Sequence, residues 1–262
     1  MGWLSRRGLL AAGLAGAGAV VLDACSGRPA GPVGVPAKAP ASTARRAPTG
    51  PAPTEPAPRG PARVVFAGPR DGQLVALTFH GSGDPAVVVR LLELLDDRGR
   101  VPVSVFAVGA WLEANPAMAE RFLAGGHELD NHTSTHPVLG RVPRATVAEE
   151  IRGCRRTLMR LTGSGGRYFR PSGMTVPTQL VLAEAGKSGY PVVVSFDVDS
   201  HDYADPGPDA IVARVTAGMR PGSIVSLHTG HAGTISALPR VLAALDARGL
   251  RPVPLHRLLA GA

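Results

Sequence analysis

The 262-residue chain has few cysteines and no long hydrophobic run, and each scarcity excludes a class of protein. With only Cys25 and Cys154, a disulfide framework is excluded. Cys154 falls on the apolar face of a predicted helix, so we expect a buried structural thiol. The apolar run at residues 8–22 is shorter than the roughly 20 residues that a membrane-spanning helix needs. What is abundant is glycine, at 33 residues, and proline, at 25.

A clustered basic surface is also not indicated by the composition. The chain has 28 basic and 20 acidic residues, but seven of the basic and two of the acidic residues lie before position 63. Residues 63–262 therefore hold 21 basic and 18 acidic residues, a net charge of only +3. This balance argues against a dedicated nucleic-acid-binding protein.

The N-terminal segment has the pattern of an export signal. A twin arginine, Arg6-Arg7, precedes the apolar run, and Leu22-Asp23-Ala24-Cys25 resembles a bacterial lipoprotein box. Residues 1–25 are predicted to be a twin-arginine signal peptide, with Cys25 as the site of lipidation and membrane anchoring. Because Asp23 is unusual in a lipoprotein box, ordinary cleavage of the signal peptide nearby is the alternative. Residues 26–62 hold 10 of the 25 prolines and are predicted to form a disordered spacer, on the order of 100 Å long if extended.

Residues 63–262 alternate between strand-like and helix-like segments and are predicted to form one domain. The predicted strands are residues 74–79, 101–108, 127–130, 168–170, 192–197, 224–227 and 253–255. The predicted helices are residues 86–98, 117–124, 146–161, 178–187, 209–219 and 234–248. Seven strand–helix units predict an α/β fold with parallel strands, either a barrel or a doubly wound sheet.

Polar residues gather where the predicted strands end. In either α/β architecture, ligands bind at the carboxyl ends of parallel strands. We therefore expect one site at this rim, formed by the residues that follow the strands: His80, His132, His136, Arg170, Asp199, Asp202 and His228.

Five ordered motifs resemble those of the polysaccharide deacetylases, the NodB-homology proteins of carbohydrate esterase family four. They are L-T-F-H-G (77–81), G-H-E-L-D-N-H-T-S-T-H-P (126–137), Y-F-R-P-S-G (168–173), D-V-D-S-H-D-Y (197–203) and G-S-I-V-S-L-H (222–228). The resemblance covers about residues 63–262. It implies a distorted (β/α) barrel of about seven parallel strands, with the site at the C-terminal rim. It also implies metal-assisted hydrolysis of N-acetyl groups on a glucosamine-containing polymer.

The resemblance implies a role for each matching residue. A divalent cation, commonly zinc, would be held by His132 and His136, whose spacing lets both rings point the same way from one helical turn. His228 would be the general acid that protonates the leaving amine, and Asp199 would orient it.

Three further residues receive roles from the same resemblance. Arg170 would hold the catalytic base in place, and the backbone N–H of Gly173 would belong to the oxyanion hole. Tyr203 is the aromatic residue closest to the motifs in sequence and is a candidate for substrate contact. Because aromatic residues make up only 4% of the chain, few other sugar-stacking side chains are available.

The first motif departs from the family pattern. Family members usually read T-F-D-D-G-P, in which the first aspartate is the base and the second a metal ligand; this chain reads T-F-H-G-S-G-D-P, with His80 and Gly81 at those positions. Two repairs are possible: His80 becomes a third ligand, or the longer loop brings Asp84 into the site, although Asp84 also fits a helix cap. His80 could instead be a neutral base near Arg170.

Three functions remain open from the sequence. The first is an exported, lipid-anchored or secreted monomeric hydrolase that acts on peptidoglycan or a related cell-wall polysaccharide at the envelope. The second is a non-catalytic glycan-binding or scaffold lipoprotein on the same fold, because both carboxylates of the first motif are missing. The third is an amidase or esterase for a small substrate.

Overall fold

The computed structural model describes residues 60–260. The predicted signal peptide, its Cys25 and nearly all of the predicted spacer lie outside the described residues, so those predictions stay untested. Within the described part, no helix is both long and apolar enough to cross a membrane.

Among residues 60–260, eight short strands form the centre of the domain, and all of their ladder pairings are parallel. They are β1 (Arg63–Val65), β2 (Leu74–Gly81), β3 (Ser104–Ala107), β4 (Glu128–Asn131), β5 (Val192–Val194), β6 (Val198–Asp199), β7 (Ile224–His228) and β8 (Arg251–Pro252). The main sheet runs in the order β4-β3-β2-β7-β6, β8 pairs with β2, and β1 pairs with β5. Phe169 bridges Asn131 of β4 to Val193 of β5, so the two groups of strands form one continuous array.

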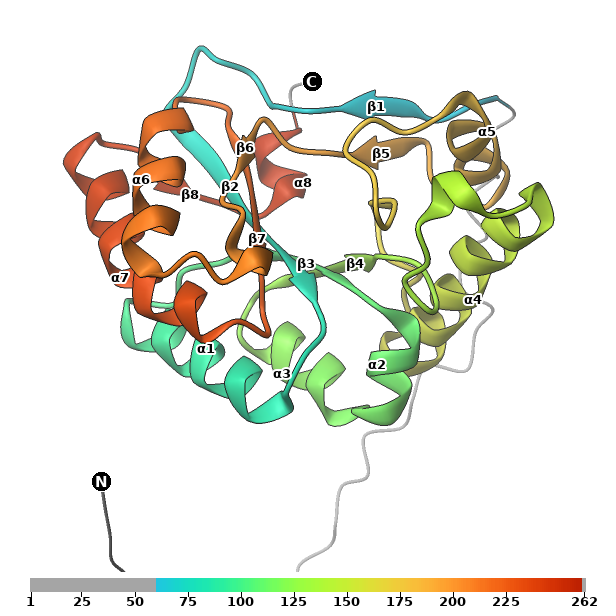
Figure 1. The fold of residues 1–262 in the computed structure, drawn as a ribbon, viewed down its shortest axis with the longest axis horizontal. Helices are drawn as coiled ribbons and strands as arrows, with labels where there is room; N and C mark the ends of the chain where they lie inside the picture. Colours follow the sequence, from blue (N-terminus) through green and yellow to red (C-terminus); the bar gives the residue numbers. More distant parts are fainter. Residues whose placement is uncertain (1–59, 261–262) are drawn as a thin grey trace, which may run out of the picture. The chain divides into compact units, whose positions relative to one another are not determined.

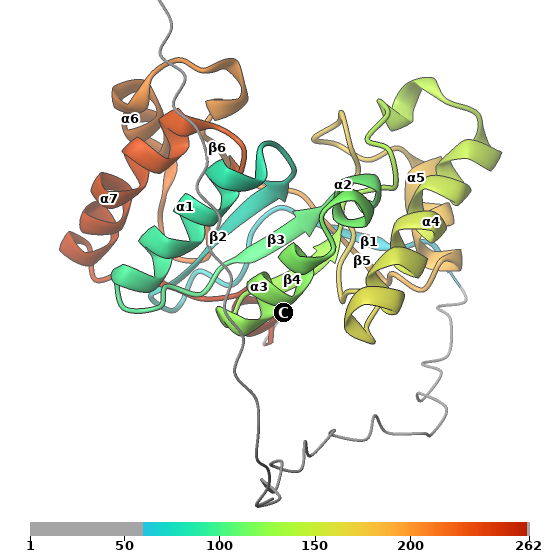
Figure 2. The same cartoon turned by 90° about the horizontal axis from the view of Figure 1, so that it is seen from below.

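The helices lie outside the strands (Figures 1 and 2). They are α1 (Pro85–Asp97), α2 (Gly109–Ala114), α3 (Ala117–Ala124), α4 (Arg144–Thr162), α5 (Gln179–Lys187), α6 (Pro208–Gly218), α7 (Ala232–Ala247) and α8 (Leu255–Leu258). Helices α6, α7 and α1 cover one side, while α4 and α5 lie together on the other. The predicted α/β class and parallel strands are confirmed.

Several predicted boundaries were wrong for local reasons. Residues 168–170 form an isolated bridge at Phe169 and no strand. The predicted strand 192–197 ends early, at Val194 of β5, and β6 begins only at Val198. Between the two strands the Asp197 side chain accepts the backbone N–H of Ile224 at 2.8 Å. The predicted strand 253–255 is wrong, because the strand in this region is β8 at Arg251–Pro252 and α8 begins at Leu255. Pro252 and Pro254 have no N–H to donate to a longer ladder.

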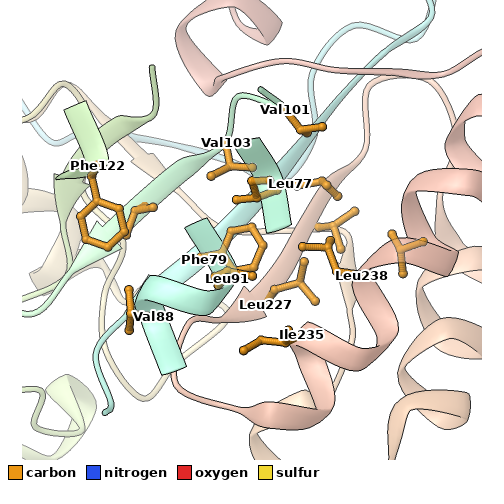
Figure 3. Packing of buried hydrophobic residues seen from close by; sticks show 14 of the residues in the cluster. Leu77, Phe79, Val88, Leu91, Val101, Val103, Phe122, Leu227, Ile235 and Leu238 are labelled. Carbon is orange, nitrogen blue, oxygen red and sulfur yellow. The ribbon is translucent and has the colours of Figure 1, made fainter. Parts of the chain in front are cut away.

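The largest core cluster packs α1 and α7 against β2, β3 and β7 (Figure 3). Leu77 and Phe79 of β2 are fully buried in it beside Leu227 of β7. Their neighbours Thr78 and His80 point to the opposite side of the sheet, because strand side chains alternate. The alternation therefore directs His80 to the face of the sheet opposite α1 and α7, at the carboxyl end of β2.

Candidate metal and catalytic centre

The carboxyl ends of β2, β4 and β7 bring the predicted residues together. His80 is in register with His228 on the neighbouring strand β7, and His132 follows the last residue of β4. The ring centroid of His80 lies 4.4 Å from that of His132 and 4.4 Å from that of His228. The site at the strand ends that the sequence predicts is therefore present.

Three imidazoles form a cluster with the geometry of a metal site. Nitrogen atoms of His80, His132 and His136 all lie within 4.8 Å of one another, and His80 Nδ1 lies 2.8 Å from His132 Nε2. His132 Nδ1 lies 2.9 Å from the Arg170 carbonyl; donation to that oxygen leaves Nε2 free to coordinate. His132 is completely buried whereas His136 is exposed, so the cluster opens to solvent on one side.

The loop between the two histidines of the second motif is not helical. Thr133 and His136 both have left-handed backbone conformations, with φ of 70° and 63°. The prediction that one helical turn aligns the rings was therefore wrong. Glu150 of α4 holds the loop instead: it accepts the backbone N–H groups of Ser134 and Thr135, each at 2.8 Å. No motif marks Glu150 in the sequence, where it is one of two adjacent glutamates on α4.

The electrostatics of the cluster suit a cation. Burial, and then the neighbouring His132 and Arg170, hold the pKa of His80 well below its ordinary value. Burial also lowers the pKa of His132 and His136. Neutral imidazoles are the form that binds metal, so these residues fit a divalent cation through a three-histidine set.

Asp84 lies outside this cluster. Its carboxylate accepts the backbone N–H of Ala86 at 2.8 Å and caps α1. The loop before Asp84 is held to Thr229, the residue that follows β7. The Ser82 backbone N–H donates to Thr229 Oγ1 (3.1 Å), and the Thr229 hydroxyl donates to the Ser82 carbonyl (2.7 Å). The alternative in which Asp84 enters the site is contradicted in this structure.

Arg170 lies beneath the histidines and is almost fully buried. Its guanidinium donates to the carbonyls of Val194 and Ser195 at 3.1 Å and lies 3.4 Å from His80 Nε2. Burial lowers the pKa of Arg170 to about 9, while Asp130 and Asp199 oppose that effect. Arg170 thus contacts the residue that stands at the usual place of the base.

Asp130 of β4 fixes the segment that carries Arg170. One carboxylate oxygen accepts the backbone N–H groups of Arg167 and Tyr168, at 2.8 and 2.9 Å. The other oxygen, Oδ2, is buried without a hydrogen-bond partner among the described residues. Burial, and next the charge of Glu128, raise the pKa of Asp130 well above its ordinary value.

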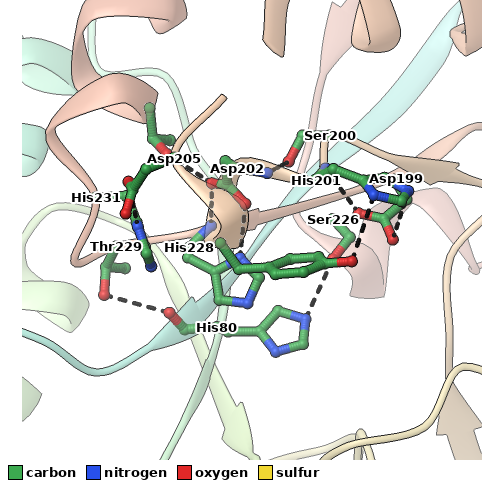
Figure 4. A network of polar contacts seen from close by, with 12 residues as sticks. His80, Asp199, Ser200, His201, Asp202, Asp205, Ser226, His228, Thr229 and His231 are labelled. Carbon is green, nitrogen blue, oxygen red and sulfur yellow. Dashed lines mark hydrogen bonds and ion pairs between the residues drawn. The ribbon is translucent and has the colours of Figure 1, made fainter. Parts of the chain in front are cut away.

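His228 is oriented by Asp202, which corrects the expectation for Asp199 (Figure 4). His228 Nδ1 lies 2.7 Å from Asp202 Oδ1, and the His228 backbone N–H donates to Oδ2 of the same carboxylate at 2.7 Å. Thr234 adds a third donor. Burial opposes ionisation of Asp202, yet the hydrogen bonds from His228 and Thr234 outweigh it and lower its pKa. Asp199 instead accepts the His201 backbone N–H at 2.9 Å.

The two remaining predicted residues also lie near the centre. Gly173 has a φ of 68°, and a Cβ there would lie 2.9 Å from the Cα of Val138, so glycine fits both the conformation and the space. Tyr203 is half exposed, and its ring centroid lies 5.6 Å from that of His228. Its ring is therefore available to a bound molecule at the rim.

Comparisons with known proteins identify the family of the chain. Residues 67–193 match the family model described as polysaccharide deacetylase. A chitooligosaccharide deacetylase of Bradyrhizobium sp. (strain ANU 289) is 36% identical, over 70% of this chain and 90% of that protein.

Solved structures give the same result. A peptidoglycan N-acetylglucosamine deacetylase is similar with a TM-score of 0.69 and 27% identity, over 76% of this chain and 94% of that one. A mutant of a CE4 family pseudoenzyme, with restored enzymatic activity, also has a TM-score of 0.69, at 25% identity over 75% of this chain and 71% of that one. With the five motifs at one rim and this similarity over most of the domain, the chain belongs to the polysaccharide deacetylase family of carbohydrate esterases (NodB homology, family four).

Proposed function

We propose that the protein is a metal-dependent hydrolase that removes N-acetyl groups from a glucosamine-containing polysaccharide such as peptidoglycan. One observation carries the proposal: three neutral imidazoles, those of His80, His132 and His136, converge beside a carboxylate-paired histidine, His228. The relatives named as deacetylases of chitooligosaccharides and of peptidoglycan support the substrate class.

The histidine cluster would hold a divalent cation, and zinc suits three imidazole ligands. A cation bound there would polarise the amide carbonyl of the substrate and lower the pKa of a bound water molecule. His80 takes the place of the missing aspartate ligand. For Nδ1 to bind the cation, Nε2 must carry the ring proton, and it can donate that proton to Ser226 Oγ, which lies 3.2 Å away. Arg170 Nη1 lies 3.4 Å from the same nitrogen and keeps a second proton off the ring through its charge.

Proton delivery to the leaving amine falls to His228. With Nδ1 directed to Asp202, its Nε2 is the nitrogen left to face substrate. The anionic Asp202 stabilises the imidazolium form, which is the form able to give a proton to the amine. The backbone N–H of Gly173 would stabilise the developing oxyanion. The negative charge of Asp199 would help to keep Arg170 protonated. Tyr203 would contact the sugar ring.

The same proposal includes an envelope location. Residues 1–25 would direct export and Cys25 would carry the lipid, so that the monomeric domain acts on cell-wall polysaccharide near a membrane. The alternative is a non-catalytic glycan-binding lipoprotein. It is favoured by the absence of both first-motif carboxylates.

Acetate release from N-acetylglucosamine oligomers and from peptidoglycan separates the two functions. The zinc-loaded full chain is expected to release acetate, and His132→Ala is expected to abolish the release while circular dichroism stays unchanged. If the wild-type chain binds these glycans but releases no acetate with any divalent metal, the non-catalytic alternative is correct.

A further inference from the structure

A second concave surface lies between α4 and the end of α5, away from the histidine cluster. Its cavity volume is about 610 Å³. The lining residues are mostly basic: Arg152, Arg155, Arg156, Met159, Arg160, Lys187, Ser188 and Gly189. Residues three, four and eight positions apart share one face of a helix, so four arginines of α4 face this groove together. Figure 2 shows α4 and α5 side by side.

Only part of this positive charge is compensated. Arg160 pairs with Glu113 and Lys187 with Glu184, both at 3.0 Å, and Arg156 pairs with Glu149. Among the described residues, no carboxylate lies within ion-pair distance of Arg152 or Arg155. The groove therefore has an excess of two guanidinium charges.

Arg155 is held in place by packing. Its guanidinium carbon lies 5.2 Å from the centre of the Tyr190 ring. A Cβ atom added at Gly165 would lie only 2.6 Å from Arg155 Nη1, and one at Gly189 would lie 3.4 Å from Cζ. The side chain thus lies in a slot that two glycines and a tyrosine make. Because packing fixes the side chain, little conformational entropy is left to lose when a ligand binds.

We propose that this groove binds a phosphate ester, with Arg155 as the central contact and Arg152 beside it. A guanidinium presents its N–H donors in a planar fork that matches two phosphate oxygens. Met159 and the arginine methylenes supply an apolar lining for the organic part of the ester. The phosphate could belong to a soluble ester or to a phospholipid headgroup.

Calorimetric titration of the full chain with glycerol 3-phosphate, at constant ionic strength, tests the site. We expect saturable binding that weakens about tenfold or more in Arg155→Gln. Gly165→Ala keeps every charge but displaces the guanidinium, so it should weaken binding as well. The matched control Arg90→Gln removes an exposed arginine on α1 and should bind as the wild type does. Thermal melting in the absence of the ester checks that each variant is folded.

A second arm identifies the source of the phosphate. Vesicles of phosphatidylcholine, with and without phosphatidylglycerol, are sedimented with the wild-type chain and with Arg155→Gln. A phosphatidylglycerol-dependent difference between the two chains assigns the site to a headgroup, while titration with glycerol 3-phosphate alone assigns it to a soluble ester. The proposal is overturned if neither probe binds, or if folded Gly165→Ala and Arg155→Gln bind as tightly as the wild type.

Discussion

At the scale of single residues, the centre combines expected side chains with one that the motifs did not identify, Glu150. His80, His132, His136, Arg170 and His228 meet at one rim because each lies at or shortly after the carboxyl end of a strand or bridge of the same parallel array. The choice between neighbouring carboxylates could not be made from the sequence. Asp199 and Asp202 are three residues apart, and the left-handed conformation of His201 (φ 54°) between them decides which one faces His228.

Replacing Asp202 with asparagine should lower the rate of acetate release about 100-fold or more, because the imidazolium of His228 loses its anionic partner. Steady-state kinetics on a chitooligosaccharide measure the effect. Asp205→Asn is the matched control, since Asp205 pairs with His231 at 2.8 Å in the same network but lies farther from His80 (Figure 4). Equal rates for Asp202→Asn and the wild type would show that Asp202 does not support His228.

At the scale of elements, local signals predicted helices better than strand ends. Asp84-Pro85 correctly indicates the start of α1, and the apolar face of α4 with its buried Cys154 follows from the spacing of its residues. The predicted helix 117–124 is confirmed as α3, although Pro116 is its N-cap and Asn115 ends α2, a short helix with no cap signal that was not predicted. Strand β1 was missed because its three residues have no alternating pattern of their own and depend on β5.

The cap of α1 gives a prediction at this scale. Asp84→Ala should lower the free energy of unfolding by about 1 kcal/mol, because the N–H of Ala86 loses its acceptor. Urea denaturation measures the loss, and Asp97→Ala at the other end of the helix should show none. The affinity for metal should stay unchanged; a loss of metal in Asp84→Ala would mean that this carboxylate enters the site.

At the scale of the whole molecule, stability should depend on pH through buried neutral histidines. Burial lowers the pKa of His127, a residue that is not part of the metal cluster. Its Nδ1 atom accepts the Val103 backbone N–H. In the unfolded chain His127 titrates near its ordinary value of about 6.5, so unfolding takes up a proton below that pH. The unfolding free energy is therefore highest above pH 6.5 and falls as the pH drops below it.

Urea denaturation between pH 7.5 and pH 5, with a chelator present, measures this dependence. In His127→Phe the slope should be shallower by up to about 1.4 kcal/mol per pH unit, although the variant loses stability at every pH. A slope identical to that of the wild type would contradict a neutral, buried His127.

The central claim is that His80 replaces a carboxylate as the third metal ligand. The most direct test is equilibrium dialysis of the full chain against buffered zinc, with circular dichroism as the check on folding. We predict one tight zinc ion per wild-type chain, unchanged binding in His231→Ala at the same rim, and binding at least about tenfold weaker in His80→Ala. Tight, stoichiometric zinc in a folded His80→Ala chain would contradict the claim.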